Sequence, residues 1–453
     1  MHAAFTTSAS NLIPVHLVAS AAWDELRAAL PENVRAFAET QDFTGNAGQK
    51  VIVPDADGAV TAVLYGLGDA RDALAVAGLS AKLTEGDYTV DTAPEDWPFD
   101  WIAAGWTDGA YRFDRYLKSE ASPPRLKIRD GDSEAFSREA EAADLLRDLI
   151  NTPAADMGPD GIEAAIQDLA KTHKADVNVV SGGDLLDANY PMIHAVGRAA
   201  TIEPRFIELS WGDKSAPVLA LVGKGVAFDS GGLNIKTGDY MRIMKKDMGG
   251  AAHVIALAAL VMGAKLLVRL KLYVPAVENA IAGNAFRPGD ILQSRKGLTV
   301  EIDNTDAEGR LVLGDALARA CEAKPDLIMD FATLTGAARV ALGPDLAPYY
   351  TDAGDVADGL DAASKASGDP LWRMPLWEAY LADLKSPIAD LVNSGGRMAG
   401  SITAALFLKQ FVGEENWVHF DVWGWRNAKY GRPAGGAPCG LRAAWAMLRS
   451  RYL

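Results

Sequence analysis

Two charged side chains stand in a glycine-rich segment that follows an apolar run. The segment, VGKGVAFDSGG, covers residues 222–232 and contains Lys224 and Asp229. Glycine permits positive φ and a close backbone approach, so such a loop can bring a ligand near the chain. A tight turn with solvated charges is one interpretation. A phosphate loop is another, but the GxxxxGK[ST] order is missing because Gly225 follows Lys224.

A second polar segment precedes the most apolar stretch of the chain. Asp247 lies just before Gly249 and Gly250, and Lys236 lies upstream in the tripeptide NIK. Asp is a common N-cap, so Asp247 could simply cap the helix that follows. Lys236, taken alone, is more typical of a surface lysine than of a catalytic group.

The third segment is acidic and contains a glycine. Its sequence, EIDNTDAEGR at 301–310, follows a strand-like run and precedes an apolar helix. Asp306 and Glu308 are two residues apart, so an extended loop can point both carboxylates toward one centre. Arg310 beside them can hold an anion. A solvated turn is the alternative, although an acidic loop between two buried elements favours a functional role.

Together the three segments offer enough carboxylates for a metal centre. Four carboxylates in close proximity repel one another and shift their pKa values unless cations neutralise them. Two divalent ions about 3.5–4 Å apart would do so and would activate a water molecule. Oxygen ligands favour Mg or Mn, whereas a nitrogen ligand leaves Zn or Co open. The candidate residues are Asp229, Asp247, Asp306 and Glu308, with Lys224, Lys236 and Arg310.

Composition narrows the classes of function. Among 453 residues, 44 basic and 60 acidic side chains give a formal charge of −16, which argues against a nucleic-acid partner and favours a cytosolic protein. Two cysteines cannot form a disulfide framework, and none of the six histidines stands in an HxxxH motif. A metal site in this chain must therefore be built mainly from carboxylates.

The elements that position these segments alternate between strand and helix after about residue 150. This rhythm indicates an α/β fold with a mixed, mostly parallel sheet covered by helices on both faces. Ligands of such sheets bind beyond the carboxyl ends of the strands, where the three segments lie. Helices are predicted at 161–173, 250–264 and 311–323, and strands at 175–180, 205–211, 218–225, 266–276 and 326–336.

The first part of the chain contains no cluster of chemically active residues. Short strands are predicted at 51–54 and 62–68, and short helices at 76–82 and 99–106. An amphipathic helix at 133–150 is predicted to link this part to the rest. We therefore expect a small N-terminal α/β domain, 1–132, and a catalytic domain, 133–453. The N-terminus lacks a basic signal region, and the apolar run 251–264 is too short to span a membrane.

The sequence NTDAEGRL resembles the signature of the leucyl aminopeptidase family of dinuclear metallopeptidases. The similarity covers about residues 110–450 and implies an enzyme that releases N-terminal amino acids from peptides. It also implies a macro-domain-like N-terminal domain. The segments that carry the resemblance are 304–311, 330–337 (DFATLTGA) and 396–404 (GRMAGSITA), with 111–116 (YRFDRY) and 151–153 (NTP).

The resemblance implies a ligand role for five residues. Asp229 and Glu308 would bridge two divalent ions, Mn or Zn. Lys224 and Asp247 would complete the tighter site, and Asp306 would complete the more exchangeable one. A lysine binds a metal only as its neutral amine, so two dications must depress its pKa far below about 10.4.

The resemblance also implies the chemistry at the site. A hydroxide held between the metals would attack the peptide carbonyl, and Lys236 would stay charged to stabilise the oxyanion. Arg310 would hold a bicarbonate that acts as general base. Met244, Thr333, Leu334 and Thr335 match positions near the substrate pocket, although Met244 and Leu334 could be plain core residues. A missing methylene is worth only about 1–3 kcal/mol, so a Leu-like but broad preference is expected.

Other expectations follow from the family or remain as alternatives. The family implies a cytoplasmic homohexamer that acts on peptides and binds neither nucleic acid nor membrane. Bulky Trp423 and Trp425 stand where the family has small residues; they could reshape substrate access or pack in the interior. His419 is expected to be a core histidine rather than a ligand. A DNA-binding relative and a two-metal phosphate hydrolase remain as competing functions.

Overall fold

The computed structural model describes residues 1–118, 121–427 and 434–453. The chain divides into two compact units: unit 1 comprises Met1–Asp144 with Arg426–Ala434, and unit 2 comprises Leu145–Trp425 with Gly435–Leu453. The division falls within helix α5 (Ser133–Asn151), which corresponds to the helix expected at 133–150. This division does not test the domain boundary expected at 132/133, which remains a prediction.

Unit 1 contains a six-stranded sheet in the order β1-β6-β5-β2-β4-β3. Its strands pair in parallel except for the β3–β4 hairpin, which contains the two strands predicted from the sequence. The strands are β1 (Phe5–Thr6), β2 (Leu12–Val18), β3 (Lys50–Pro54), β4 (Val60–Gly66), β5 (Asp87–Thr92) and β6 (Arg125–Lys127). The helices are α1 (Trp23–Ala29), α2 (Glu32–Thr40), α3 (Ala77–Ser80) and α4 (Phe99–Ala110), with short 3₁₀ turns at Ser20–Ala22 and Asp130–Asp132.

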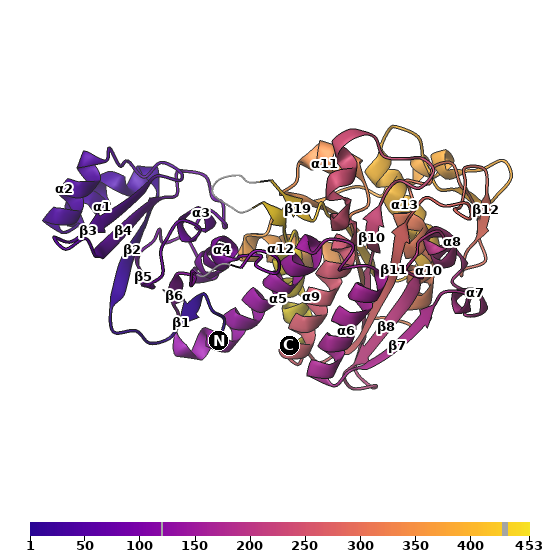
Figure 1. Ribbon diagram of the computed structural model, residues 1–453, viewed down its shortest axis with the longest axis horizontal. Helices are drawn as coiled ribbons and strands as arrows, with labels where there is room; N and C mark the ends of the chain where they lie inside the picture. Colours follow the sequence, from indigo (N-terminus) through magenta and orange to yellow (C-terminus); the bar gives the residue numbers. More distant parts are fainter. Residues whose placement is uncertain (119–120, 428–433) are drawn as a thin grey trace. The chain divides into compact units, whose positions relative to one another are not determined.

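Unit 2 is built around a nine-stranded mixed sheet (Figure 1). Its path is β16-β15-β18-β14-β9-β11-β8-β7, and β10 pairs with β11 beside this path. The central pairs are parallel, whereas β7, β8 and β15 introduce antiparallel pairs. The strands are β7 (Asp176–Ser181), β8 (Arg205–Trp211), β9 (Val218–Gly223), β10 (Gly225–Asp229), β11 (Arg269–Asn279), β14 (Leu327–Ala332), β15 (Ala347–Tyr350), β16 (Leu371–Arg373) and β18 (Trp417–Asp421).

Helices cover both faces of this sheet, as the alternating pattern predicted. On one face α9 packs on β9 and β14 and is flanked by α6 and α14; on the other, α10 packs on β9 and β11 beside α8 and α13. The helices are α6 (Pro159–His173), α7 (Asp184–Asp187), α8 (Pro191–Gly197), α9 (Gly249–Gly263), α10 (Gly309–Cys321), α11 (Gly336–Leu342), α12 (Gly354–Ser367), α13 (Gly400–Val412) and α14 (Leu441–Tyr452), with 3₁₀ segments η3 (Gly238–Met248) and η4 (Glu378–Leu384).

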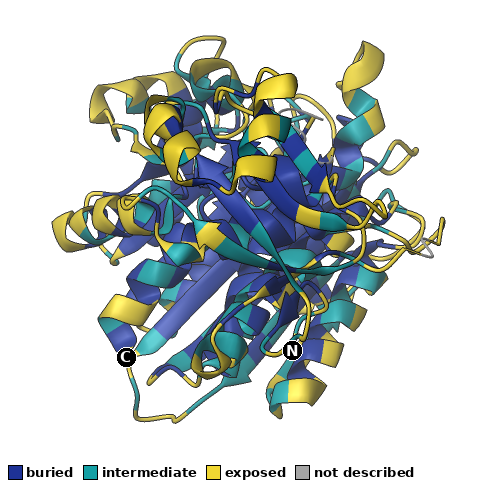
Figure 2. Cartoon of the chain, turned by 90° about the vertical axis from the view of Figure 1, so that its left-hand side faces the viewer, coloured by how far each residue is buried: buried dark blue, intermediate teal, exposed yellow. Residues whose placement is uncertain are grey.

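Burial explains why α9 is apolar all round. The helix lies between the sheet and other helices, so it has no solvent-facing stripe to make polar. Figure 2 shows the same contrast across the chain, with dark blue central strands and exposed outer helix turns. None of the helices in the three described ranges combines the length and apolarity that a membrane span requires.

Two predicted strands have different limits in the structure. The strand expected at 218–225 is two strands, because the chain bends at Lys224 and β10 pairs with β11 alone. Gly225 permits the close approach of β10 to β11, since a Cβ there would lie 2.6 Å from the Pro275 carbonyl oxygen. The strand expected at 266–276 is β11, which starts after a turn at Lys265 (φ 54°) and continues to Asn279. Smaller ladders comprise β12 (Ile291–Gln293), β13 (Thr299–Glu301) and β17 (Leu391–Val392), and β19 (Trp425–Arg426) with β20 (Gly435–Gly436).

Candidate metal centre and substrate pocket

Adjacent strands deliver the site at their carboxyl ends. Lys224 follows β9, Asp229 ends β10, Asn279 ends β11, and Thr333 follows β14. Because these strands run parallel, their carboxyl ends meet at one edge of the sheet. The fold therefore brings together groups that are more than a hundred residues apart in the chain.

Asp247 is not the N-cap of α9, so that alternative interpretation is wrong. The helix begins at Gly249 with Met248 at the cap, and no side chain caps it. Instead, the Asp247 carboxylate accepts a hydrogen bond from Thr333 Oγ1 (2.8 Å). The glycines that follow let α9 approach β14, since a Cβ on Gly250 would lie 2.1 Å from the Phe331 carbonyl oxygen.

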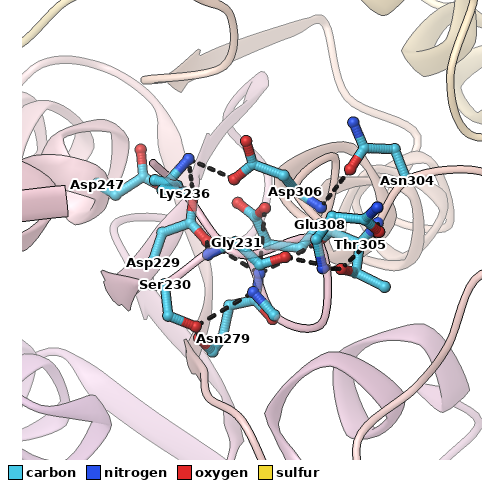
Figure 3. Close-up of polar contacts among 12 residues, drawn as sticks. Asp229, Ser230, Gly231, Lys236, Asp247, Asn279, Asn304, Thr305, Asp306 and Glu308 are labelled. Carbon is cyan, nitrogen blue, oxygen red and sulfur yellow. Dashed lines mark hydrogen bonds and ion pairs between the residues drawn. The ribbon is translucent and has the colours of Figure 1, made fainter. Parts of the chain in front are cut away.

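The acidic loop before α10 is held by its own side chains. Thr305 Oγ1 donates to the Gly231 carbonyl (2.7 Å), and Asn304 Oδ1 accepts from the Asp306 backbone N–H (2.9 Å). Glu308 is only 1% exposed, so the solvated-turn interpretation does not apply to it. In Figure 3 the Asp306 and Glu308 side chains lie beside Asp229, as the sequence spacing predicted.

Two lysines bind the four carboxylates. Lys224 Nζ lies 2.7 Å from Asp247 Oδ2 and 3.0 Å from Glu308 Oε1. Lys236 Nζ lies 2.7 Å from Asp229 Oδ2 and also pairs with Asp306 (Figure 3). Its side chain is 14% exposed, so Lys236 is not a surface lysine.

Burial and mutual repulsion perturb the carboxylates. Burial, followed by the neighbouring Asp247, raises the pKa of Asp229. Burial and then Asp229 raise the pKa of Glu308, and burial with Glu308 raises that of Asp306. For Asp247, burial acts in the same direction, but Lys224 and its other lysine neighbours outweigh it and lower the pKa. Such a cluster favours additional cations.

The pKa values of the two lysines are also raised. Burial alone would lower the pKa of Lys224, but Asp247 and Glu308 outweigh it and raise the pKa well above its usual value. The carboxylates of Asp229 and Glu308 likewise overcome burial at Lys236. The described residues fit a metal centre, since oxygens of Asp229, Asp306 and Glu308 all lie within 4.8 Å of one another.

Arg310 is a buried cation near this cluster. Its Nε and Nη1 atoms have no hydrogen-bond partner among the residues that the structure describes. Burial lowers its pKa to about 10, while Glu308 and Asp421 act in the opposite direction. A buried guanidinium with unused donors is suited to an anion with several oxygen atoms, such as bicarbonate.

A cavity of about 380 Å³ adjoins the carboxylates. Every residue expected near the substrate lines it: Met244, Thr333, Leu334 and Thr335. Asp421 fixes this wall, because its Oδ1 accepts the backbone N–H groups of Leu334 and Thr335 at 3.0 Å each.

Trp423 also lines the cavity, where it could reshape substrate access, whereas Trp425 is absent from the lining. Lys245 lies 5.7 Å from the Trp425 ring. His419 is fully buried in β18 and pairs through Nδ1 with Asp330 at 2.6 Å. It is therefore a core histidine, as expected.

Four residues of the site escaped the sequence analysis. Asn279 is fully buried and donates to Asp229 Oδ1 (2.9 Å), so it orients a candidate ligand. Extending the predicted strand by three residues would have found it. Asp421 stands at the end of an apolar strand in the same way. Lys246 and Arg339 also line the cavity. Lys246 directly precedes Asp247, which could have indicated it, whereas the apolar sequence neighbours of Arg339 give no signal of that position.

Comparison with known proteins assigns this arrangement to a family. The description "Cytosol aminopeptidase family, catalytic domain" fits residues 144–443, and "M17 aminopeptidase, N-terminal domain" fits residues 13–128. The chain belongs to the cytosol aminopeptidase family. The resemblance seen in the sequence is thereby confirmed, as are the fold and the enzyme class, a metal-dependent aminopeptidase.

Relatives of this aminopeptidase span most of its length. A probable cytosol aminopeptidase of Aquifex aeolicus is 40% identical over 75% of this chain and 72% of its own. The chloroplastic leucine aminopeptidase 2 of Arabidopsis thaliana is 42% identical over 72% and 60%. The crystal structure of a Coxiella burnetii cytosol aminopeptidase superposes with a TM-score of 0.93 at 42% identity, covering 98% of each chain. The bottromycin maturation enzyme BotP in complex with Mn gives a TM-score of 0.86 at 33% identity, covering 98% of this chain and 100% of its own.

Proposed function

We propose that this aminopeptidase removes N-terminal residues from peptides with two divalent ions bound by its carboxylate cluster. The observation that carries the proposal is the convergence of four carboxylates and two lysines beside a cavity at the strand ends. Asp229 and Glu308 would bridge the ions. Lys224 and Asp247 would complete the tighter site, and Asp306 the more exchangeable one.

Bound ions would polarise the scissile carbonyl and supply the hydroxide nucleophile. The neighbours of Asp229 keep its carboxylate in place, because Asn279 Nδ2 and the Gly231 N–H both donate to its Oδ1 (2.9 and 2.8 Å). Lys224 would have to release its proton to become a ligand, which the added positive charge would promote. Mn and Zn are the proposed metals; the Mn complex of BotP supports the former.

Lys236 and Arg310 would act on the substrate. Lys236 lies between Asp229 and Asp306 and would remain an ammonium that stabilises the developing oxyanion. Arg310 would hold a bicarbonate through its unused Nε and Nη1 donors, and this base would carry the proton to the leaving amine. Arg310 is 8% exposed, so water competes little for the anion.

The substrate proposal is a Leu-like, broad preference. Met244 and Leu334 provide apolar contacts on the cavity wall, and Thr333 and Thr335 provide hydroxyl groups. We further propose a cytoplasmic homohexamer, which the family resemblance supports together with the name cytosol aminopeptidase carried by several relatives. The catalytic domain is proposed to begin at residue 133.

The test combines activity with metal content. The protein loaded with Mn should hydrolyse leucine p-nitroanilide, and Glu308→Ala should abolish hydrolysis and leave fewer than two ions per chain. Glu301→Ala is a matched control, because Glu301 precedes the same loop but does not line the cavity. Retention of both ions by the Glu308 variant would remove this residue from the bridging role.

A further inference from the structure

The cavity has a buried cation that the proposed reaction does not use. Lys246 is 2% exposed and lines the cavity wall. Its nearest carboxylate atom is Asp247 Oδ1 at 3.6 Å, and Asp247 already pairs with Lys224 at 2.7 Å. A buried charge is costly unless a counter-charge compensates it. Lys246 is therefore only weakly paired by the chain itself.

A second cation stands on the same wall. Arg339 in α11 is half-buried, and its guanidinium lies 4.2 Å from the centre of the Trp423 ring. The Lys246 ammonium lies 4.1 Å from a Trp423 ring centre. Within residues 1–118, 121–427 and 434–453, no carboxylate forms an ion pair with Arg339. Contact with an aromatic face positions a cation but leaves its hydrogen-bond donors available.

The charges of the site show what this wall would bind. With the two divalent ions and the hydroxide of the proposed function, the four carboxylates leave one negative charge, which Lys236 offsets, and Lys224 is neutral as a ligand. Lys246 and Arg339 then remain as positive charges around the cavity. The substrate pocket is thus cationic, although the whole chain carries a net charge of −16. A substrate carboxylate would compensate that charge, and a substrate ammonium would increase it.

We propose that Arg339 and Lys246, both held against Trp423, make the pocket prefer an N-terminal glutamate or aspartate over the amide of the same size, glutamine or asparagine. The inference rests on the proposed function and adds a charge preference within its broad range of substrates. The planar guanidinium can bind a carboxylate through two parallel hydrogen bonds. Trp423 reduces the ordering cost by holding that group before substrate arrives.

The test compares substrates of equal size and different charge. The Mn-loaded enzyme is assayed with p-nitroanilides of glutamate, glutamine, lysine and leucine. We expect kcat/KM for glutamate to exceed that for glutamine by about tenfold or more, and lysine to be the poorest substrate. Arg339→Gln should bring the glutamate-to-glutamine ratio close to one. The ratio is independent of a general loss of folded or metal-loaded enzyme.

Arg242→Gln is the matched control. Arg242 is an exposed arginine in η3 that does not line the cavity, so the same loss of charge there should leave the ratio unchanged. Binding of free glutamate and glutamine to the Mn-loaded protein, measured by calorimetry, gives a readout that needs no turnover. Tighter binding of glutamate, lost in Arg339→Gln, supports the inference.

The outcomes separate the two proposals. Hydrolysis of the leucine substrate with equal rates for glutamate and glutamine overturns the charge preference but leaves the aminopeptidase proposal intact. Equal binding of the two free amino acids also overturns it. Absence of hydrolysis of every anilide refutes the proposed function, and the calorimetry then still decides whether the wall selects a carboxylate.

Discussion

Gly309→Ala should damage the metal centre while sparing the fold. Gly309 is the first residue of α10, directly after Glu308, and a Cβ there would lie 2.5 Å from Lys224 Cε and 2.6 Å from Lys224 Nζ. Ordinary contact begins at 3.4 Å, so the end of the lysine must retreat by about 0.9 Å. A flexible side chain can make that movement, and the backbone need not follow.

The size of the effect follows from how strictly metals require their ligands. Metal–ligand distances in good sites vary by only about ±0.2 Å, well below the enforced retreat of Lys224. Displacement of groups that support a metal typically weakens its binding about 10–100-fold. We expect a loss of that size at one of the two ions, with a comparable loss of kcat. The assay is Mn binding by competition with a chelator, together with turnover of leucine p-nitroanilide.

Two further alanine variants make this prediction specific. A Cβ on Gly283 would contact nothing within 4 Å, so Gly283→Ala should leave metal affinity and thermal midpoint unchanged. A Cβ on Gly314, also in α10, would lie 2.8 Å from Met192 Cε, so Gly314→Ala should lower the midpoint without a selective metal loss. If Gly309→Ala binds both ions with undiminished affinity, Lys224 is not a metal ligand.

Three other predictions test separate parts of the molecule. Lys236→Ala should lower kcat by about two orders of magnitude with both ions retained; loss of metal would show that its role is misassigned. Arg310→Ala should cause a smaller loss of kcat, which added bicarbonate should partly restore. If bicarbonate does not raise the activity of this variant, Arg310 does not hold the general base. His253 accepts from the Cys439 N–H at 3.0 Å, and burial lowers its pKa to about 4. As the pH falls, His253 therefore takes up a proton in the unfolded chain before it does so in the folded protein, which favours unfolding. Up to about 3 kcal/mol of folding stability should be lost between pH 6.5 and 4. In thermal melts across this range, His253→Gln should show a shallower decline than the wild type; parallel declines would contradict the assignment.

The fold class and the carboxylate cluster could be predicted from the sequence because each depends on local pattern. Buried parallel strands are continuous apolar runs, and the polar residues that end them are conspicuous. Asp229 and Glu308 stand at such positions, and the structure brings them together. The carboxyl ends of parallel strands lie at the same edge of the sheet. Polar residues at these ends are therefore expected to cluster, even before any tertiary contact is known.

The remaining features depend on contacts that no local pattern contains. Lys265 adopts a left-handed turn that delays the start of β11 to Arg269, and the strand then continues past the predicted end at residue 276 to Asn279. Lys246 directly precedes Asp247, and Arg339 stands among apolar residues in the sequence, but only the fold places both against Trp423. Short strands such as β15 (Ala347–Tyr350) lack enough residues for a periodic signal and were not predicted.

The loop after β14 constrains how new specificities can evolve in this enzyme. The Thr333 carbonyl accepts a hydrogen bond from Lys224, and the Thr333 hydroxyl donates one to Asp247. The backbone N–H groups of the next two residues donate to the Asp421 carboxylate. In the proposed function, one stretch of backbone would thus support both catalysis and substrate recognition, and a mutation that shifts it should impair both at once. Substitutions that change which N-terminal residue the enzyme accepts should therefore accumulate on side chains that line the cavity from other segments, such as Trp423.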